Sequence, residues 1–549
     1  MTGGFGVLDW AVVLGFLVVT TVVGGRMAGK QATLRDFFLG GRKLPWYAVA
    51  GSIIATEISA VTFISFPFVV FRPGGDLTYL QLGIFGLLLA RLIVGYVLVP
   101  AYYEREIYSP YDFMGNRLGP RVRATATSLF ALGGVLAQAA RVYLTAVVLE
   151  VLLHDELDWL AAHTGIPPLV GAVASIGVFA VLWTLIGGIA TVVWTDVILF
   201  LVFLVGIAIA FFSATSALDG GAAEVFQRSW EAGKFRFLDF DTDPTTAYTI
   251  WAAIIANTVW GVGAFGTDQL LAQRILCCRD ARDARKAVIA SYAAMLVTVL
   301  VGFVGMALFA YYEVHPLEGA ALALYEAKGD RIFPIFIFQV IPSPLKGLVV
   351  AGVFAAAISS LDSILAALSQ SVLQVLKLPQ TVRASRVLVV VFGVLLCVMA
   401  VLMERVHEAY PSILDLALAM AGYTVGALFA GFALAFWGRG IDGSGYVWSA
   451  PLGVMTVFAV AWHEPWSRVV CLVFAAGILV AWIAARRRGA LDWRMLVILA
   501  GVGLVLLLNR RLEEAIAFPW FAPIGFVVAF GGGWLLSGRA PLAGSERAS

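Results

Sequence analysis

The chain has 549 residues, of which 61% are hydrophobic and 13% are charged. Soluble domains carry roughly 25% charged residues, so this composition excludes an ordinary soluble protein and indicates a membrane protein. The formal net charge is only +2, which gives no basis for binding nucleic acid. The four cysteines and five histidines do not have the spacing of a metal site, so neither disulfides nor metal chemistry is indicated.

Hydrophobic segments of about 20 residues, the length that crosses a bilayer, recur along the whole chain. The first runs from Leu8 to Val23 and lacks the positively charged start of a cleavable signal peptide, so we interpret it as a spanning helix. Further spans are predicted at 45–70, 76–101, 124–152, 168–187, 190–214, 247–270, 287–312, 345–374, 386–403, 412–437, 445–462, 467–485, 493–508 and 518–537. We therefore predict an all-α polytopic membrane protein with 13 to 15 transmembrane helices.

Lysine and arginine accumulate in every second loop, which is typical of the cytoplasmic side of a membrane. The basic loops contain, for example, Arg26, Lys30 and Arg35, then Arg105, Arg117, Arg121 and Arg123, then Arg274, Arg279 and Arg282, then Lys377 and Arg383, then Arg486 to Arg488. The intervening loops are more acidic or mixed. We therefore expect a multi-pass protein of the cell membrane with its N-terminus outside and a cytoplasmic tail at 538–549.

Two spans carry residues that interrupt helices. The second contains Glu57, Ser59 and Pro67, and the seventh contains three glycines within 260–266. Because these spans are five apart, residues 44–215 and 245–437 are predicted to form two inverted five-helix repeats. An extra helix and loop at 1–43 precede the repeats, and peripheral helices at 444–537 follow them. Interrupted helices at equivalent positions of an inverted repeat predict a transporter with its site near the membrane midplane, where unwound backbone can meet ions and solutes.

Five short motifs, in order and in register, resemble those of the sodium/solute symporter family. They are Asp36–Arg42, Ile58–Ile64, Gly187–Asp196, Gln269–Arg274 and Ala356–Ser360. The likeness covers roughly residues 1–440 and is nearer to the bacterial and monocarboxylate or vitamin branches than to the sugar transporters. It implies the leucine-transporter fold, in which one extra helix precedes two inverted five-helix repeats. Relatives of this kind usually have fewer spans, so Trp466 to Asn509 is predicted to form an additional helical pair.

A stripe of small and hydroxyl residues on the ninth span is the candidate ion site. Its members are separated by three, four and seven residues and therefore share one helix face: Ala356, Ser359, Ser360 and Ser363. Hydroxyl and carbonyl oxygens suit a hard monovalent cation. The resemblance implies a sodium ion between Ala356, Ser359 and Ser360 and the carbonyls of Ala55 and Ile58. The alternative is that these serines bond only to their own or a neighbouring helix.

Two acids inside predicted spans indicate a possible second cation site. A carboxylate at the bilayer centre costs at least about 2.5 kcal/mol, so such residues usually serve a function. In some relatives an acid at the position of Asp196, which follows Thr195, holds a second sodium ion together with serines of the ninth span. Here Asp362, next to Ser363, stands where those relatives have a hydroxyl. This extra acid could strengthen cation binding, carry a proton or pair with an arginine, and Asp196 could instead face water.

The candidate solute site lies beside the interrupted second span. The resemblance places Glu57 where sugar-transporting relatives face their solute, but the other sugar-binding positions are Thr62, Gly261 and Ala417 here, so a sugar is disfavoured. Arg141 offers planar, bidentate recognition of a carboxylate. Phe265 is a candidate to stack on the solute. The alternatives are an internal ion pair between Arg141 and Glu57, and a packing role for Phe265.

These features predict a sodium-coupled symporter that imports a small polar organic solute by alternating access, with Na⁺ as its coupling ion. A carboxylate or an amino acid is favoured over a sugar. A proton-coupled carrier of the same fold is the main alternative, and a channel or a membrane sensor is less consistent with two interrupted helices. The sequence shows no catalytic constellation, so we do not expect an enzyme. The expected partners are the solute and the lipid bilayer, and the oligomeric state is not predicted.

Overall fold

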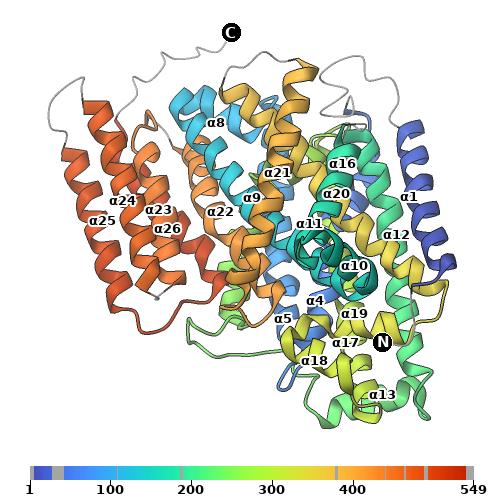
Figure 1. Ribbon diagram of the computed structural model, residues 1–549. Helices are drawn as coiled ribbons and strands as arrows, with labels where there is room; N and C mark the ends of the chain where they lie inside the picture. Colours follow the sequence, from blue (N-terminus) through green and yellow to red (C-terminus); the bar gives the residue numbers. More distant parts are fainter. Residues whose placement is uncertain are drawn as a thin grey trace. The chain divides into compact units, whose positions relative to one another are not determined.

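The computed structural model is built from helices (Figure 1). It describes residues 5–27, 42–107, 109–185, 189–376, 381–438, 440–462, 465–486 and 493–538. Within these residues the one extended pairing is an isolated β-bridge between Leu44 and Cys278, so the predicted all-α class is confirmed. Most of the motif at 36–42, part of the motif at 187–196 and nearly all of the predicted tail lie outside the described residues.

The chain divides into two compact units that interleave along the sequence. Unit 1 comprises residues 1–84, 134–239 and 273–420, and unit 2 comprises residues 85–133, 240–272 and 421–549. Each unit takes helices from both predicted repeats, because a repeat is defined by sequence order and a unit by packing. The boundaries of the repeats, 44–215 and 245–437, therefore stay a prediction.

The second predicted span is broken in unit 1. Its two halves, α3 (Trp46–Glu57) and α4 (Ala60–Phe71), are bent by 52°. Ile58 leaves the helical conformation, with φ −82° and ψ 84°, and the Ser59 side chain caps α4 by accepting a hydrogen bond from the amide of Val61 at 3.3 Å. Serine is among the residues preferred at a helix N-terminus, since its oxygen accepts from an amide that lacks a helical partner. The predicted interruption is confirmed.

A buried lysine from a distant loop holds the other end of α4. Lys234 follows α13 (Gly221–Glu231), and its ammonium group donates to the carbonyls of Val70, Phe71, Arg72 and Gly75 at 2.7, 3.2, 3.3 and 3.2 Å. The last carbonyls of a helix have no partner within it and carry the negative end of its dipole. Lys234 therefore fixes the end of the broken span that lies farther from the break.

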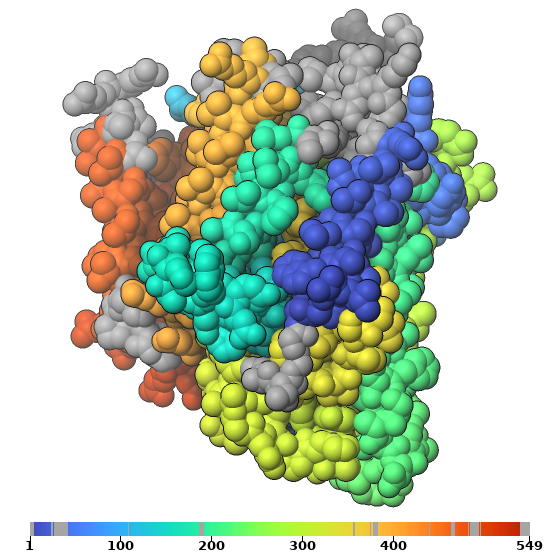
Figure 2. Space-filling model, turned by 45° about the vertical axis from the view of Figure 1, so that its right-hand side comes forward, coloured from blue at the N-terminus to red at the C-terminus, as the bar shows by residue number. Residues whose placement is uncertain are grey.

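The centre of unit 1 is α20 (Leu345–Val375), which packs against α1, α4, α11, α12 and α21. Other helices of unit 1 are α1 (Val7–Met27), α10 (His154–Thr164), α11 (Pro168–Thr184), α12 (Ile189–Thr215), α16 (Ala281–Ala290), α17 (Ala294–Val314), α18 (Gly319–Ala327), α19 (Ile332–Gln339) and α21 (Val382–His407). Figure 2 shows α10 and α11 between α1 and α21 on one face of this unit. Large apolar side chains of α1 and α21 are exposed, for example Val18 and Val394, as expected for helices that face lipid.

Unit 2 holds the ends of several long helices and the C-terminal bundle. Its elements include α6 (Leu88–Ile93), α7 (Val99–Glu104), α8 (Pro110–Leu118), α14 (Thr258–Gly266), α23 (Tyr446–Ala461), α24 (Pro465–Arg486), α25 (Trp493–Arg511) and α26 (Phe521–Leu536). Three further helices, α9 (Pro120–Leu152), α15 (Gln269–Ile275) and α22 (Ile413–Trp437), pass from one unit into the other. The predicted additional pair is present as α24 and α25, which pack on α23, and Asn509 donates to the carbonyls of Ala459 and Trp462 at 2.8 and 2.7 Å.

In the seventh predicted span the helix ends after the three glycines and does not unwind at the first two. Helix α14 continues through Gly261 and Gly263 and ends at Gly266. A Cβ atom on Gly261 would lie 2.6 Å from the Cβ of Ala90 on α6, and one on Gly263 would lie 2.8 Å from a methyl group of Val425 on α22. These two glycines therefore allow close packing of helices, and the unwinding that we predicted for them occurs just beyond the end of α14.

Seven helices in the described residues are long and apolar enough to cross a membrane, and two bent pairs would raise that number to nine. Several shorter apolar helices account for other predicted spans, among them 252–266, 446–461 and 467–480. The multi-pass character of the chain is thus confirmed, while the number of 13 to 15 transmembrane helices stays a prediction.

Candidate functional site

The break between α3 and α4 changes the backbone hydrogen bonds of unit 1. The amide of Ser59 donates to the carbonyl of Glu57 at 3.1 Å instead of to the carbonyl of Ala55, its partner in a continuous helix. The helical pattern resumes when the amide of Phe63 donates to the carbonyl of Ser59 at 3.1 Å. A carbonyl released from a helix in this way can accept another donor or coordinate a cation.

The candidate sodium residues of α20 lie on the helix that packs against both halves of the broken span. Ser360 is 4% exposed, and on the broken span Ala55 and Ile58 are 7% and 1% exposed. Ala356 and Ser359 belong to the same helix by their backbone, but their side chains lie outside what the structure describes. The packing thus brings the two predicted halves of the sodium site onto adjacent helices, and the ion ligands themselves remain a prediction.

A buried ion pair stands at the predicted second cation site. The guanidinium of Arg274, on α15, lies 3.2 Å from a carboxylate oxygen of Asp196, on α12, and the two side chains are 1% and 0% exposed. Ser52 of α3 donates to the same oxygen of Asp196 at 2.6 Å and accepts from Nε of Arg274 at 2.9 Å. A further guanidinium hydrogen bond of 2.9 Å reaches the hydroxyl of Ser363 on α20. Four helices therefore meet at one charged cluster, which we call the Arg274 cluster.

The four residues predicted for the second cation site do not all belong to this cluster. Asp196 and Ser363 do, whereas the hydroxyl of Thr195 donates to the carbonyl of Val192 in its own helix at 3.0 Å. Asp362 lies near Thr184, whose hydroxyl donates to the carbonyl of Ala180 at 2.8 Å, and within electrostatic range of the ion pair. Asp196 is fully buried, which contradicts the alternative that it faces water.

Two members of the Arg274 cluster, Arg274 and Ser52, were not predicted to belong to the site. Arg274 was recognised only as the last residue of a family motif and as a loop charge. A signal was present, because a carboxylate such as Asp196 within a span needs a cationic or hydrogen-bonding partner when it is buried. Arg274 adjoins the seventh span and could therefore have been considered as that partner.

The predicted solute residues fall on both units. Glu57, the last residue of α3, lies within electrostatic range of the Tyr79 hydroxyl, and Thr62 in the first turn of α4 is 8% exposed. Arg141 is half-buried on the part of α9 that belongs to unit 1. Phe265 belongs to unit 2, where it is 1% exposed and its ring lies 4.3 Å from the guanidinium of Arg91. Phe265 thus packs against a cation in its own unit, and its contact with a solute stays a prediction.

Comparison with known proteins agrees with the fold and the family. The "Sodium/sialic acid symporter SiaT" of Proteus mirabilis is 29% identical over 375 residues, which cover 66% of this chain and 70% of that protein. The human "Sodium-coupled monocarboxylate transporter 1" is 27% identical over 452 residues, covering 79% of this chain and 69% of that protein. The "Sodium/sialic acid symporter NanT" of Aliivibrio fischeri is 29% identical over 442 residues, covering 78% and 83%.

A solved structure of a Na⁺-coupled sialic acid symporter, substrate-bound and outward-open, superposes with a TM-score of 0.72 at 23% identity, and the match covers 98% of this chain and 100% of that chain. This likeness confirms the predicted leucine-transporter-like fold. The model of the "Sodium:solute symporter family" matches residues 37–453, which include both halves of the broken span and all of α20. The chain therefore belongs to the sodium:solute symporter family.

Proposed function

We propose that this protein is a sodium-coupled symporter that imports a small carboxylate-bearing solute by alternating access. The observation that carries the proposal is the broken span α3–α4 packed against α20. The break releases the carbonyl of Ala55 and takes Ile58 out of the helix, and α20 supplies Ala356, Ser359 and Ser360. Five oxygen ligands from two helices suit Na⁺ and would couple its binding to the distance between those helices.

A carboxylate is the solute group that the residues and the relatives favour. Sialic acid and monocarboxylates, which the curated relatives are named for, share this group. Arg141 supplies a guanidinium that can bind it through two parallel hydrogen bonds. Glu57 and Thr62, beside the break, would contact polar groups elsewhere on the solute. Glu57 also gives the site an acceptor for an amino or hydroxyl group.

The sodium gradient is sufficient to drive uptake. One charge crossing 100 mV releases about 2.3 kcal/mol, and a tenfold concentration gradient adds about 1.4 kcal/mol. Together they support roughly 500-fold accumulation of a neutral or zwitterionic solute for each ion. An anionic carboxylate moved with one Na⁺ carries no net charge and gains only about tenfold from the concentration gradient, so a second ion would add the full sum of about 3.7 kcal/mol, or roughly 500-fold, to its uptake. For this direction of transport the N-terminus lies outside, as the basic loops predict.

Transport by purified protein in liposomes tests the proposal. We expect uptake of a monocarboxylate or of sialic acid to require an inward Na⁺ gradient and to stop when K⁺ replaces Na⁺. Arg141→Gln should raise KM for the carboxylate solute, and Arg141→Lys should raise it less, because lysine keeps the charge but loses the planar fork. Sodium-driven uptake of a sugar alone, or uptake of carboxylates that ignores Na⁺, would contradict the proposal.

Proton coupling is a second candidate, and the observation behind it is the Arg274 cluster. Asp196 and Asp362 bring two carboxylates close to one guanidinium, and an added positive charge would lower the cost of burying them in a low-dielectric interior. A proton on Asp362 would do so, and so would a second sodium ion held by Asp362, Ser363, Asp196 and Thr195. Uptake driven by a pH gradient in the absence of Na⁺, and lost in Asp362→Asn, would establish proton coupling.

A further inference from the structure

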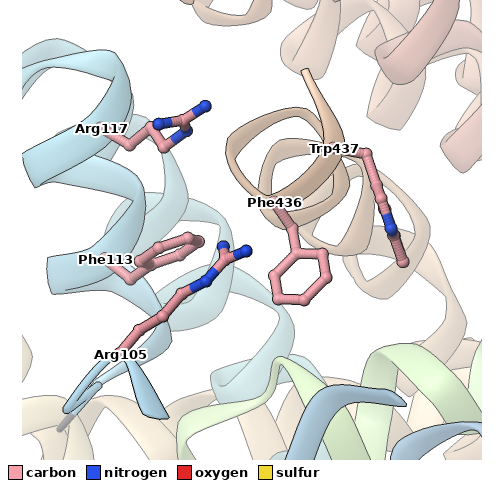
Figure 3. Close-up of a pocket in the computed structure, with 5 residues that line it drawn as sticks. All are labelled: Arg105, Phe113, Arg117, Phe436 and Trp437. Carbon is pink, nitrogen blue, oxygen red and sulfur yellow. The ribbon is translucent and has the colours of Figure 1, made fainter. Parts of the chain in front are cut away.

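A pocket in unit 2 is lined by two arginines and three aromatic residues, far along the chain from the predicted sodium ligands. Its volume is about 670 Å³, and its lining consists of Arg105, Phe113, Arg117, Phe436 and Trp437. Arg105 follows α7, Phe113 and Arg117 belong to α8, and the other two residues end α22. Figure 3 shows the two guanidinium groups on one side and the rings of Phe436 and Trp437 on the other.

The Arg105 guanidinium lies over two of the aromatic rings. The guanidinium carbon lies 4.6 Å from the centre of the Phe436 ring and 6.0 Å from that of Phe113. The ring of Trp437 stands edge-on to Phe436 at 4.9 Å. A guanidinium stacked on rings keeps its N–H groups in the plane between them, and those donors match the oxygens of an anion.

Acidic side chains are missing from the lining in the part of the chain that the structure describes. The nearby Asp112 of α8 is paired with Arg123 at 2.8 Å, and Glu104 and Glu106 flank Arg105 in sequence without lining the pocket. The Arg117 guanidinium donates to the carbonyl of Gly438 at 3.4 Å. Two cations therefore face the pocket without an acid that neutralises them among the described residues.

The pocket stands where a membrane-spanning helix ends. Helix α22 is apolar enough to cross the bilayer, and its last residue is Trp437, which is 50% exposed. Tryptophan is enriched at the level of the lipid headgroups. The loop that carries Arg105 and Arg117 is predicted to be cytoplasmic, the side on which basic pockets between helices bind anionic headgroups.

We propose that this pocket binds a phosphate group, and that an anionic phospholipid of the cytoplasmic leaflet presents it. Arg105 and Arg117 donate to the phosphate oxygens, while Phe113, Phe436 and Trp437 cover the glycerol and the first carbons of the acyl chains. Free inorganic phosphate has the same charged group and is the other possible source. The inference rests on unit 2 alone and is independent of which solute is transported.

Native mass spectrometry of the detergent-purified full-length protein tests the proposal. Phosphatidylglycerol and phosphatidylcholine are added in separate titrations, and inorganic phosphate is titrated by calorimetry. We expect phosphatidylglycerol to bind more tightly than phosphatidylcholine. At about 1 kcal/mol for each basic residue, loss of one arginine should weaken phosphatidylglycerol binding about 5-fold, and the double variant Arg105→Gln/Arg117→Gln should weaken it about 30-fold.

The matched control removes two charges from the same predicted side of the membrane, in Arg282→Gln/Lys286→Gln. Both residues are exposed on α16, in the other unit. If the double pocket variant does not fold, the single variant Arg117→Gln, which loses only one long contact, replaces it.

Loss of lipid binding in the pocket variants alone supports a headgroup site. The same selective loss for inorganic phosphate alone supports a site for soluble phosphate. Equal loss in the control, or no preference for phosphatidylglycerol over phosphatidylcholine together with no phosphate binding, would overturn the proposal.

Discussion

The guanidinium of Arg274 lies 3.2 Å from the carboxylate of Asp196, and both side chains are almost completely buried. Asp196 was predicted to hold a second cation. In the structure the cation beside it is the side chain of Arg274. Ser52 and Ser363 complete the hydrogen bonds of the pair. Since the pair joins α12 to α15 and reaches α3 and α20, it connects the broken span with the helix that carries three of the predicted sodium ligands.

Removing either member of this pair should destabilise the protein strongly. Asp196→Asn or Arg274→Gln leaves one buried charge without its partner, which typically costs about 3–5 kcal/mol. The double variant should lose less than the sum of the two single losses, because no uncompensated charge remains. Thermal unfolding of the four proteins in detergent measures this coupling, and strictly additive losses would show that the pair does not act as a unit.

Sodium activation should depend on the hydroxyl of Ser360. In Ser360→Ala the ion loses one of its five predicted ligands, and we expect the Na⁺ concentration for half-maximal uptake to rise about tenfold, equivalent to about 1.4 kcal/mol. The control is Ser369→Ala on the same helix, since the Ser369 hydroxyl donates to the carbonyl of Leu365 at 2.7 Å. The site would be wrong if both variants kept the Na⁺ dependence of the parent protein.

Adding a methyl group at Gly261 should force α14 and α6 apart. In Gly261→Ala the new Cβ would lie 2.6 Å from the Cβ of Ala90. Both atoms are attached directly to the backbone, so neither can rotate away, and overpacking of this kind costs about 1–3 kcal/mol. Gly503→Ala, in α25, is the control because a Cβ there meets nothing within 4 Å. We expect a lower melting temperature only for the first variant, and equal melting temperatures would contradict the close packing.

Lys234 should stabilise the C-terminal end of α4. Lys234→Met keeps the length of the side chain but removes the donor to four carbonyls, and each carbonyl left unsatisfied adds to a loss of about 1–3 kcal/mol. Lys234→Arg keeps the charge but places a wider group in a site that is 2% exposed, so it should recover only part of the stability. Hydrogen exchange at the amides of α4 would measure the effect, and unchanged protection in Lys234→Met would argue against this capping role.

Much of the architecture follows from the sequence because the bilayer restricts what a chain can do. Spans of lipid-compatible length, the alternation of basic loops and the helix-breaking residues near Ser59 each depend on local chemistry. They predicted the all-α class and the broken second span, while the resemblance of five short motifs indicated the family. The three glycines of the seventh span were less informative, since the same residues serve tight helix packing and helix interruption. Only the neighbours Ala90 and Val425 decide between the two.

The charged residues required the tertiary structure. The sequence by itself determined that Asp196 and Asp362 are costly within a membrane span and must have a purpose. It did not determine that Arg274, 78 residues further along the chain, neutralises Asp196, or that Asp362 instead contacts Thr184. Hydrophobic periodicity acts on a single helix and can be read from one segment, whereas the partner of a buried charge depends on which helices pack together. Helix packing therefore decided the electrostatics around Asp196 and Asp362, where a second cation site was predicted.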